Sequence, residues 1–91
     1  MIQVFDNDDA GYLEWLAANG GGYVLNTTNP ATREYLMLHR ATCRHVTGSP
    51  SNGRQWTVQY LKVVADAAHP IESWCVARLD GRPTWCAHCK P

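Results

Sequence analysis

The chain has 91 residues, the length of one domain, which leaves no room for a second hydrophobic core. Eight Lys and Arg residues balance eight Asp and Glu residues, and no apolar run approaches the ~20 residues of a membrane-spanning helix. The acidic N-terminus lacks the basic and apolar regions of a secretory signal, so we expect a cytoplasmic protein with reduced cysteines and no membrane partner.

The first half of the chain predicts a helix followed by a hairpin. Residues 5–22 begin with capping acids, carry an apolar stripe and end in three glycines, which predicts a helix. The stripe consists of Ala10, Leu13, Leu16 and Ala17. Residues 22–27 and 34–40 are predicted strands that pair across a turn at Pro30.

The second half predicts a loop, a strand and a helix. Residues 47–54 have a loop composition, and residues 55–65 are β-rich, with Trp56, Val58, Tyr60 and Lys62 expected on one face. Residues 68–79 predict a helix that buries Ile71, Trp74, Cys75 and Leu79. We therefore expect a single α+β domain over residues 1–91, in which a short antiparallel sheet is flanked by two helices and the whole is stabilised by zinc. Three tryptophans are predicted to lie in its core, namely Trp15, Trp74 and Trp85.

Two short-spaced pairs of soft ligands predict the metal site. His39 and Cys43 are separated by three residues, and Cys86 and Cys89 by two. Structural zinc takes four Cys or His ligands in a tetrahedron, often as two such pairs that the fold brings together. Neither pair has an adjacent acid to act as a base, so we expect a closed, structural Zn²⁺ site.

Other soft side chains are weaker candidates for ligands. Cys75 falls on the apolar side of the second predicted helix, where a free thiol acts as a small hydrophobe. His45 and His88 each lie beside a stronger ligand and are expected at the surface, and His69 reads as a helix-start residue.

The segments HRATC and WCAHCKP resemble the zinc domain of the Ada DNA-repair family over roughly residues 35–91. In this resemblance His39 and Cys43 match the first ligand pair, Arg40 the family's arginine, and Cys86 to Pro91 the closing knuckle and its basic residue. It implies a DNA-binding zinc scaffold. The family's methyl-accepting thiolate is replaced by His39, whose imidazole cannot perform that chemistry.

The pattern GYVLNT, LHRATCR and WT..Y.K also resembles the small N-terminal domains of McrB-type, modification-dependent restriction proteins. That resemblance implies recognition of 5-methylcytosine in double-stranded DNA, with a GTPase motor and a nuclease in other domains or subunits. The expected function is therefore non-catalytic recognition of modified DNA.

The residues between 31 and 62 carry a net charge of +4, which favours contact with phosphate. A reader of methylated DNA needs phosphate contacts, a base-edge contact and an apolar surface for the methyl group. The candidates for these contacts are Arg40, Arg44, Arg54, Lys62, Trp56, Tyr35 and Tyr60. The aromatic members are also typical core residues of a strand.

Two other functions stay open at this point. One is an enzyme, either an Ada-like methyl acceptor or a zinc hydrolase, although the sequence has no Ser-His-Asp order, paired carboxylates or Gly-rich phosphate loop. The other is a protein-interaction module, in which the neutral charge and the tryptophans serve a partner surface.

Overall fold

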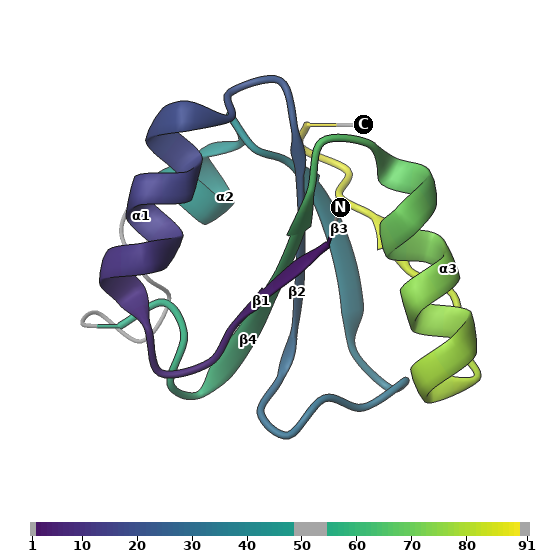
Figure 1. Cartoon of the computed structure of the whole chain (residues 1–91). Coiled ribbons are helices and arrows are strands. Elements are labelled where there is room, and N and C mark those ends of the chain that lie inside the picture. The colour runs from purple at the N-terminus through teal and green to yellow at the C-terminus, as the bar shows by residue number, and fades with distance from the viewer. Residues whose placement is uncertain (1, 49–54, 90–91) are drawn as a thin grey trace.

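The computed structural model describes residues 2–48 and 55–89 and has three layers. Helices α1 (Asp9–Ala18) and α2 (Arg44–Thr47) cover one face of a five-stranded sheet, and α3 (Ala68–Leu79) covers the other, as Figure 1 shows. The expected α+β class with helices on both sides of a short sheet is confirmed.

The sheet is mixed rather than wholly antiparallel. Its strand order is β1-β4-β2-β3-β5, and only the β3–β5 pair is parallel. The predicted hairpin is confirmed, because β2 pairs antiparallel with β3 and sets Leu25 opposite Leu38. The strands are β1 (Gln3–Phe5), β2 (Tyr23–Thr28), β3 (Leu36–Arg40), β4 (Tyr60–Ala65) and β5 (Thr84–Trp85).

Helix α1 begins and ends close to its prediction but buries a different face. The Asp8 carboxylate caps it by accepting a hydrogen bond from the Gly11 amide at 3.0 Å. Tyr12 is its fully buried residue, whereas Leu13 of the predicted stripe is 45% exposed. The Tyr12 hydroxyl donates to the Val46 carbonyl at 2.8 Å, and this bond ties α1 to α2. Of the predicted stripe only Leu16 packs against the core, and the exposed Ala10, Leu13 and Ala17 show that the prediction was wrong for the other three residues.

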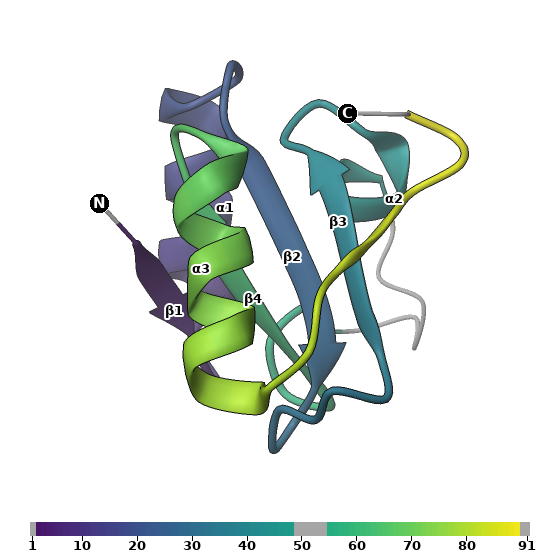
Figure 2. The same cartoon turned by 90° about the vertical axis from the view of Figure 1, so that its right-hand side faces the viewer.

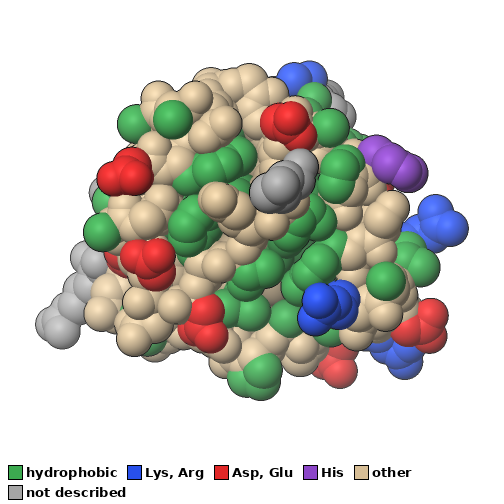
Figure 3. Space-filling model, viewed as in Figure 1, with side chains coloured by type: hydrophobic (Ala, Val, Ile, Leu, Met, Phe, Trp, Pro, Cys, Tyr) green, Lys and Arg blue, Asp and Glu red, His purple; other side chains and the backbone are tan. Residues whose placement is uncertain are grey.

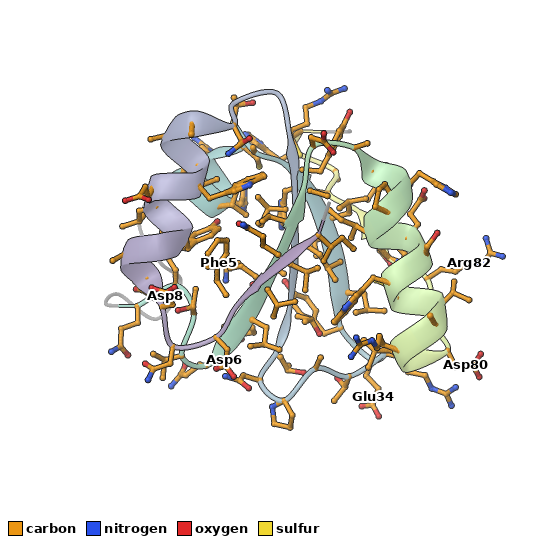
Figure 4. All side chains as sticks on the ribbon, viewed as in Figure 1. Phe5, Asp6, Asp8, Glu34, Asp80 and Arg82 are labelled. Atoms are coloured by element: carbon orange, nitrogen blue, oxygen red, sulfur yellow. The ribbon has the colours of Figure 1, made fainter. Side chains whose placement is uncertain are left out.

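Alternate residues of the central strands build a separate core on each face. Val24 and Val64 pack under α1 and α2, while Leu25 and Val63 pack under α3. Figure 4 shows Phe5 pointing from β1 toward α1, where it joins the first of these cores.

The bounds of α3 agree with its prediction, but the preceding strand is shorter than expected. Strand β4 begins at Tyr60, because the Asp9 carboxylate of α1 accepts hydrogen bonds from the Trp56 amide at 2.7 Å and the Thr57 amide at 2.8 Å. These bonds hold the segment before β4 against the start of α1 instead of in the sheet.

The C-terminal segment crosses back to the end of β3. Figure 2 shows it running from the end of α3 past β3 toward α2. Strand β5 pairs Thr84 with Met37 and Trp85 with Leu38, and the Cys86 amide donates to the Leu38 carbonyl at 2.9 Å. This crossing brings the last cysteines of the described chain beside the end of β3.

Candidate metal centre

Four side chains from two distant segments of the chain meet at the end of β3. His39 lies in β3, Cys43 is the N-cap residue of α2, and Cys86 and Cys89 follow β5. Their ligand atoms all lie within 4.8 Å of one another, so the four residues could hold one metal ion. The sequence prediction that these four residues form one cluster is confirmed.

Backbone hydrogen bonds put the two ligand pairs in place. The Cys43 amide donates to the Arg40 carbonyl at 2.9 Å, which turns the chain between the first two ligands. The Val46 amide donates to the Cys43 carbonyl at 3.0 Å and starts α2 at that cysteine. On the other side, the parallel β3–β5 pairing carries Cys86 to the same end of the sheet.

Main-chain amides point at the sulfur atoms, as expected for thiolate ligands. The Arg40 amide donates to Cys89 Sγ at 3.3 Å. Burial raises the pKa of Cys86, but hydrogen bonds from the backbone amides of Cys89 and His88 outweigh burial, and the pKa falls below its usual value. Burial raises the pKa of Cys43 to about 11, and the neighbouring cysteines add to this rise. Three thiolates this close together would repel one another, and a bound cation would offset that repulsion.

His39 supplies the strongest sign that the cluster suits a metal ion. Its side chain is 5% exposed, and its Nδ1 atom is buried without a hydrogen-bond partner among residues 2–48 and 55–89. A buried polar atom left unpaired costs about 1–3 kcal/mol, and a metal ligand bond would remove that cost. Burial first, and then the nearby charges of His45 and Lys62, lower the pKa of His39 to about 4. The imidazole is therefore neutral at pH 7 and able to donate its lone pair.

The other soft side chains stay outside the cluster, as expected. Cys75 is fully buried in the core under α3, across the sheet from the four ligands. His45 and His88 are exposed beside the cluster, with ring centroids 4.9 Å apart, and His45 stacks on His39 at 6.2 Å. These two surface histidines partly cover the ligand set.

Two of the predicted DNA-contacting residues lie at the surface of the metal centre. Arg40 is the last residue of β3 and Arg44 is the first residue of α2, and both are exposed. Arg40 Nε donates to the Cys89 carbonyl at 3.4 Å, so its side chain bridges the two ligand pairs. Tyr35 comes just before β3, at the end of that strand away from the metal centre. It is 37% exposed, and its ring centroid lies 6.1 Å from that of half-buried Tyr60 in an edge-on arrangement.

Two other candidates are inside the fold, which corrects the expectation that they contact DNA. Trp56 is 7% exposed and packs against Tyr12, with ring centroids 5.8 Å apart. Lys62 is 3% exposed, and its Nζ donates to Asn26 Oδ1 at 2.6 Å and to the Trp56 carbonyl at 2.7 Å. Both side chains point into the layer under α1, so neither can reach a duplex in this fold. Arg54 lies outside the described residues.

Asn26 is a partner that the sequence prediction missed. It stands directly opposite Lys62 in the β2–β4 pairing, and its amide also donates to the Tyr35 hydroxyl at 3.4 Å. The available signal was one polar side chain within the otherwise apolar YVLN run. Its pairing register could not be read from that run alone.

No protein-family model, curated protein sequence or solved structure matches the chain. None of the helices that the structure describes is long and apolar enough to cross a membrane. Fold and site together define a small three-layered α+β domain with a His-Cys₃ cluster that could hold one metal ion.

Proposed function

We propose that this domain holds a structural zinc ion and recognises modified, 5-methylcytosine-containing duplex DNA without catalysing a reaction. The observation that carries the proposal is the exposure of Arg40 and Arg44 directly beside the four metal ligands. A GTPase motor and a nuclease in other domains or subunits would act on the DNA that this domain selects.

The ligand chemistry supports zinc in a closed site. Cys₃His is a common ligand set for structural zinc, with sulfur atoms roughly 3.8 Å apart when each lies about 2.3 Å from the ion. The observed separations of up to 4.8 Å need only a small contraction to reach that geometry. A four-ligand site leaves no open position for a zinc-bound water, so it favours a structural role over hydrolysis.

The charge distribution supports a nucleic-acid partner. Every acidic residue of the chain lies outside residues 35–65 and 81–91, the two segments that supply the metal ligands. In Figure 3 the α1 side of the molecule shows acidic side chains and, among the described residues, no Lys or Arg. A protein with no net charge can therefore attract phosphate at the basic surface beside the metal ligands, while the acidic side chains on the α1 side repel phosphate.

Arginine chemistry supports a role in reading a modified CG step. The planar guanidinium makes two hydrogen bonds to guanine O6 and N7, worth about 1–3 kcal/mol of discrimination, and its face can contact a neighbouring 5-methyl group. Arg40 is the better candidate for this contact, because its bond to the Cys89 carbonyl holds the side chain in place before DNA binds. Arg44 at the start of α2 is the candidate for phosphate. Tyr35 offers a further exposed aromatic surface.

A fluorescence-anisotropy titration with methylated and unmethylated duplexes of one sequence, at several salt concentrations, tests the proposal. We expect tighter binding of the methylated duplex and an affinity that falls with salt. Arg40→Ala should weaken binding of the methylated duplex about 5–150-fold and remove the preference for it over the unmethylated duplex, as expected for a lost base contact. Arg44→Ala should weaken both duplexes alike and reduce the salt slope by about 1.

Arg78→Ala is the matched control, because Arg78 is equally exposed but lies on α3, across the sheet from the metal centre. Zinc content is measured for every variant, so that loss of the metal is not mistaken for loss of a DNA contact. Equal affinity for the two duplexes would contradict recognition of the methyl group. Absence of binding at low salt, where phosphate contacts are strongest, would refute a DNA partner altogether.

A further inference from the structure

Two exposed histidines lie at the solvent side of the metal centre, and neither belongs to the four-ligand cluster. His45 is in α2, and His88 lies between the ligands Cys86 and Cys89. The two histidines are far apart in the sequence, but Figure 2 shows the C-terminal segment ending beside α2. Within the residues that the structure describes, neither imidazole has a hydrogen-bond partner, so both rings keep nitrogen atoms free to bind an ion.

The geometry of the two rings matches that of two imidazoles bound to one metal ion. Zinc–nitrogen bonds are about 2.0–2.1 Å long, which sets each ring centre about 3.2 Å from the ion and the two ring centres about 4.5–5.2 Å apart at ordinary coordination angles. The ring centroids of His45 and His88 are 4.9 Å apart. Their planes are inclined at 52° instead of stacked, so a nitrogen edge of each ring can turn toward a common point.

The four-ligand cluster holds both histidines in place and favours a cation beside them. The ring of His45 stacks on that of His39, with centroids 6.2 Å apart, and the backbone amide of His88 donates to the Cys86 sulfur. A divalent ion bound to three thiolates and a neutral imidazole leaves the cluster with a net negative charge, which attracts a second cation. The exposed guanidinium of Arg44, next to His45 in the chain, opposes this attraction, so we expect the second ion to bind more weakly than the first.

We propose that His45 and His88 form a second, exposed metal site that binds one divalent transition-metal ion with a preference for imidazole, such as Ni²⁺, Cu²⁺ or Zn²⁺. Two imidazoles leave the remaining coordination positions of the ion to water or to an anionic ligand, so this site is open, unlike the four-ligand cluster. This inference rests on the proposed function only for the zinc ion in the cluster, and it does not depend on DNA binding.

A nickel titration of the zinc-loaded, full-length chain tests the second site, with calorimetry for binding and elemental analysis after dialysis for metal content. Ni²⁺ is the probe because it suits imidazole ligands, whereas the thiolate-rich cluster favours zinc. We expect one nickel ion per chain at saturation, with the zinc content unchanged. Mg²⁺ at the same concentrations should not bind, because it prefers oxygen ligands.

Substitution of either histidine gives the sharper test. His45→Gln and His88→Gln should each weaken nickel binding at least ~10-fold, because each removes one of the two protein ligands. Both side chains are exposed, and glutamine is a good helix former, so these variants should fold normally and keep their zinc. His69→Gln is the matched control, since His69 is also exposed but lies on α3, across the sheet from the metal centre. This control should leave nickel binding unchanged.

A zinc-loaded chain that takes up no nickel would overturn the proposal. So would nickel uptake that is matched by a loss of zinc, or nickel binding that survives either single substitution. Zinc content well below one ion per chain in the wild type would count instead against the structural site of the proposed function, so the two failures are distinguishable. The DNA titration is carried out without nickel and is independent of these outcomes.

Discussion

Two cysteines of this chain differ in environment, and their removal should separate metal binding from ordinary core packing. Cys89 belongs to the metal cluster, and its sulfur accepts the Arg40 amide at 3.3 Å. Cys75 is fully buried in the core under α3 and lies outside that cluster. We predict that Cys89→Ala reduces the dependence of stability on metal by about a quarter, whereas Cys75→Ala leaves that dependence intact.

The magnitude follows from the ligand count. Structural zinc contributes about 10 kcal/mol of apparent folding free energy, so one of four ligands accounts for roughly 2.5 kcal/mol. For a domain of this size each 1 kcal/mol moves the melting temperature by about 4–8 °C. Cys89→Ala should therefore lower the Tm of the zinc-loaded protein by about 10–20 °C. Cys75→Ala deletes one buried sulfur and should cost about 1 kcal/mol, hence about 4–8 °C, with or without zinc.

Thermal unfolding followed by circular dichroism, with zinc and with a chelator, measures both effects. In chelator we expect the wild type and Cys89→Ala to melt within a few degrees of each other, because the lost ligand no longer has an ion to hold. If the chelator lowers the Tm of the wild type and of Cys89→Ala by the same amount, Cys89 is not a ligand. If it lowers neither, the fold needs no metal and the reasoning fails.

Three further substitutions probe the layer under α1. Lys62→Met removes a buried amine, and burial lowers the pKa of that amine from 10.5 to about 8. Between pH 8 and 10.5 the unfolded chain therefore binds more protons than the folded chain. The free energy of unfolding of the wild type, relative to that of the variant, should rise by about 3 kcal/mol over this range in urea titrations. Tyr12→Phe deletes the 2.8 Å bond to the buried Val46 carbonyl and should cost about 1–3 kcal/mol in the same assay, and a loss near zero would mean that water replaces the hydroxyl. Burial raises the pKa of Asp9, but hydrogen bonds from Thr57 and the Trp56 amide outweigh burial, so the pKa is lowered. Asp9→Asn should therefore reduce the free energy of unfolding by about 1–3 kcal/mol near pH 7, and this deficit should shrink as the pH falls below 3.8. A deficit that does not change with pH would contradict the role of the charge.

The metal cluster could be predicted from sequence because its signal is local and chemical. His39 and Cys43 are four positions apart in the sequence, and Cys86 and Cys89 have a spacing that lets the backbone curl around an ion. Helix α3 was predictable for a similar reason, since its buried residues Ile71 and Cys75 recur at helical spacing.

The missed features depend on partners that are distant in the chain. Lys62 looks like a solvated strand residue until the sheet places Asn26 opposite it and α1 covers it. The sequence around Trp56 predicts a strand, but its amide donates a hydrogen bond to the Asp9 carboxylate, 47 residues away in sequence, and not to a neighbouring strand. Strands β1 and β5 span three and two residues, too few to show a period-2 pattern.

Because β5 is short, the metal ligands would also hold this strand in the sheet. Two residue pairs with β3 are too few to hold a terminal strand in place on their own. Cys86 and Cys89 follow β5 directly, so a metal ion that binds them together with His39 would fix that strand along β3. Trp85, the neighbour of Cys86, was predicted to lie in the core but is 39% exposed beside α3, and the same ion would fix its position. A single ion would therefore order both the arginine-bearing surface beside the ligands and the segment that carries Trp85 along β3.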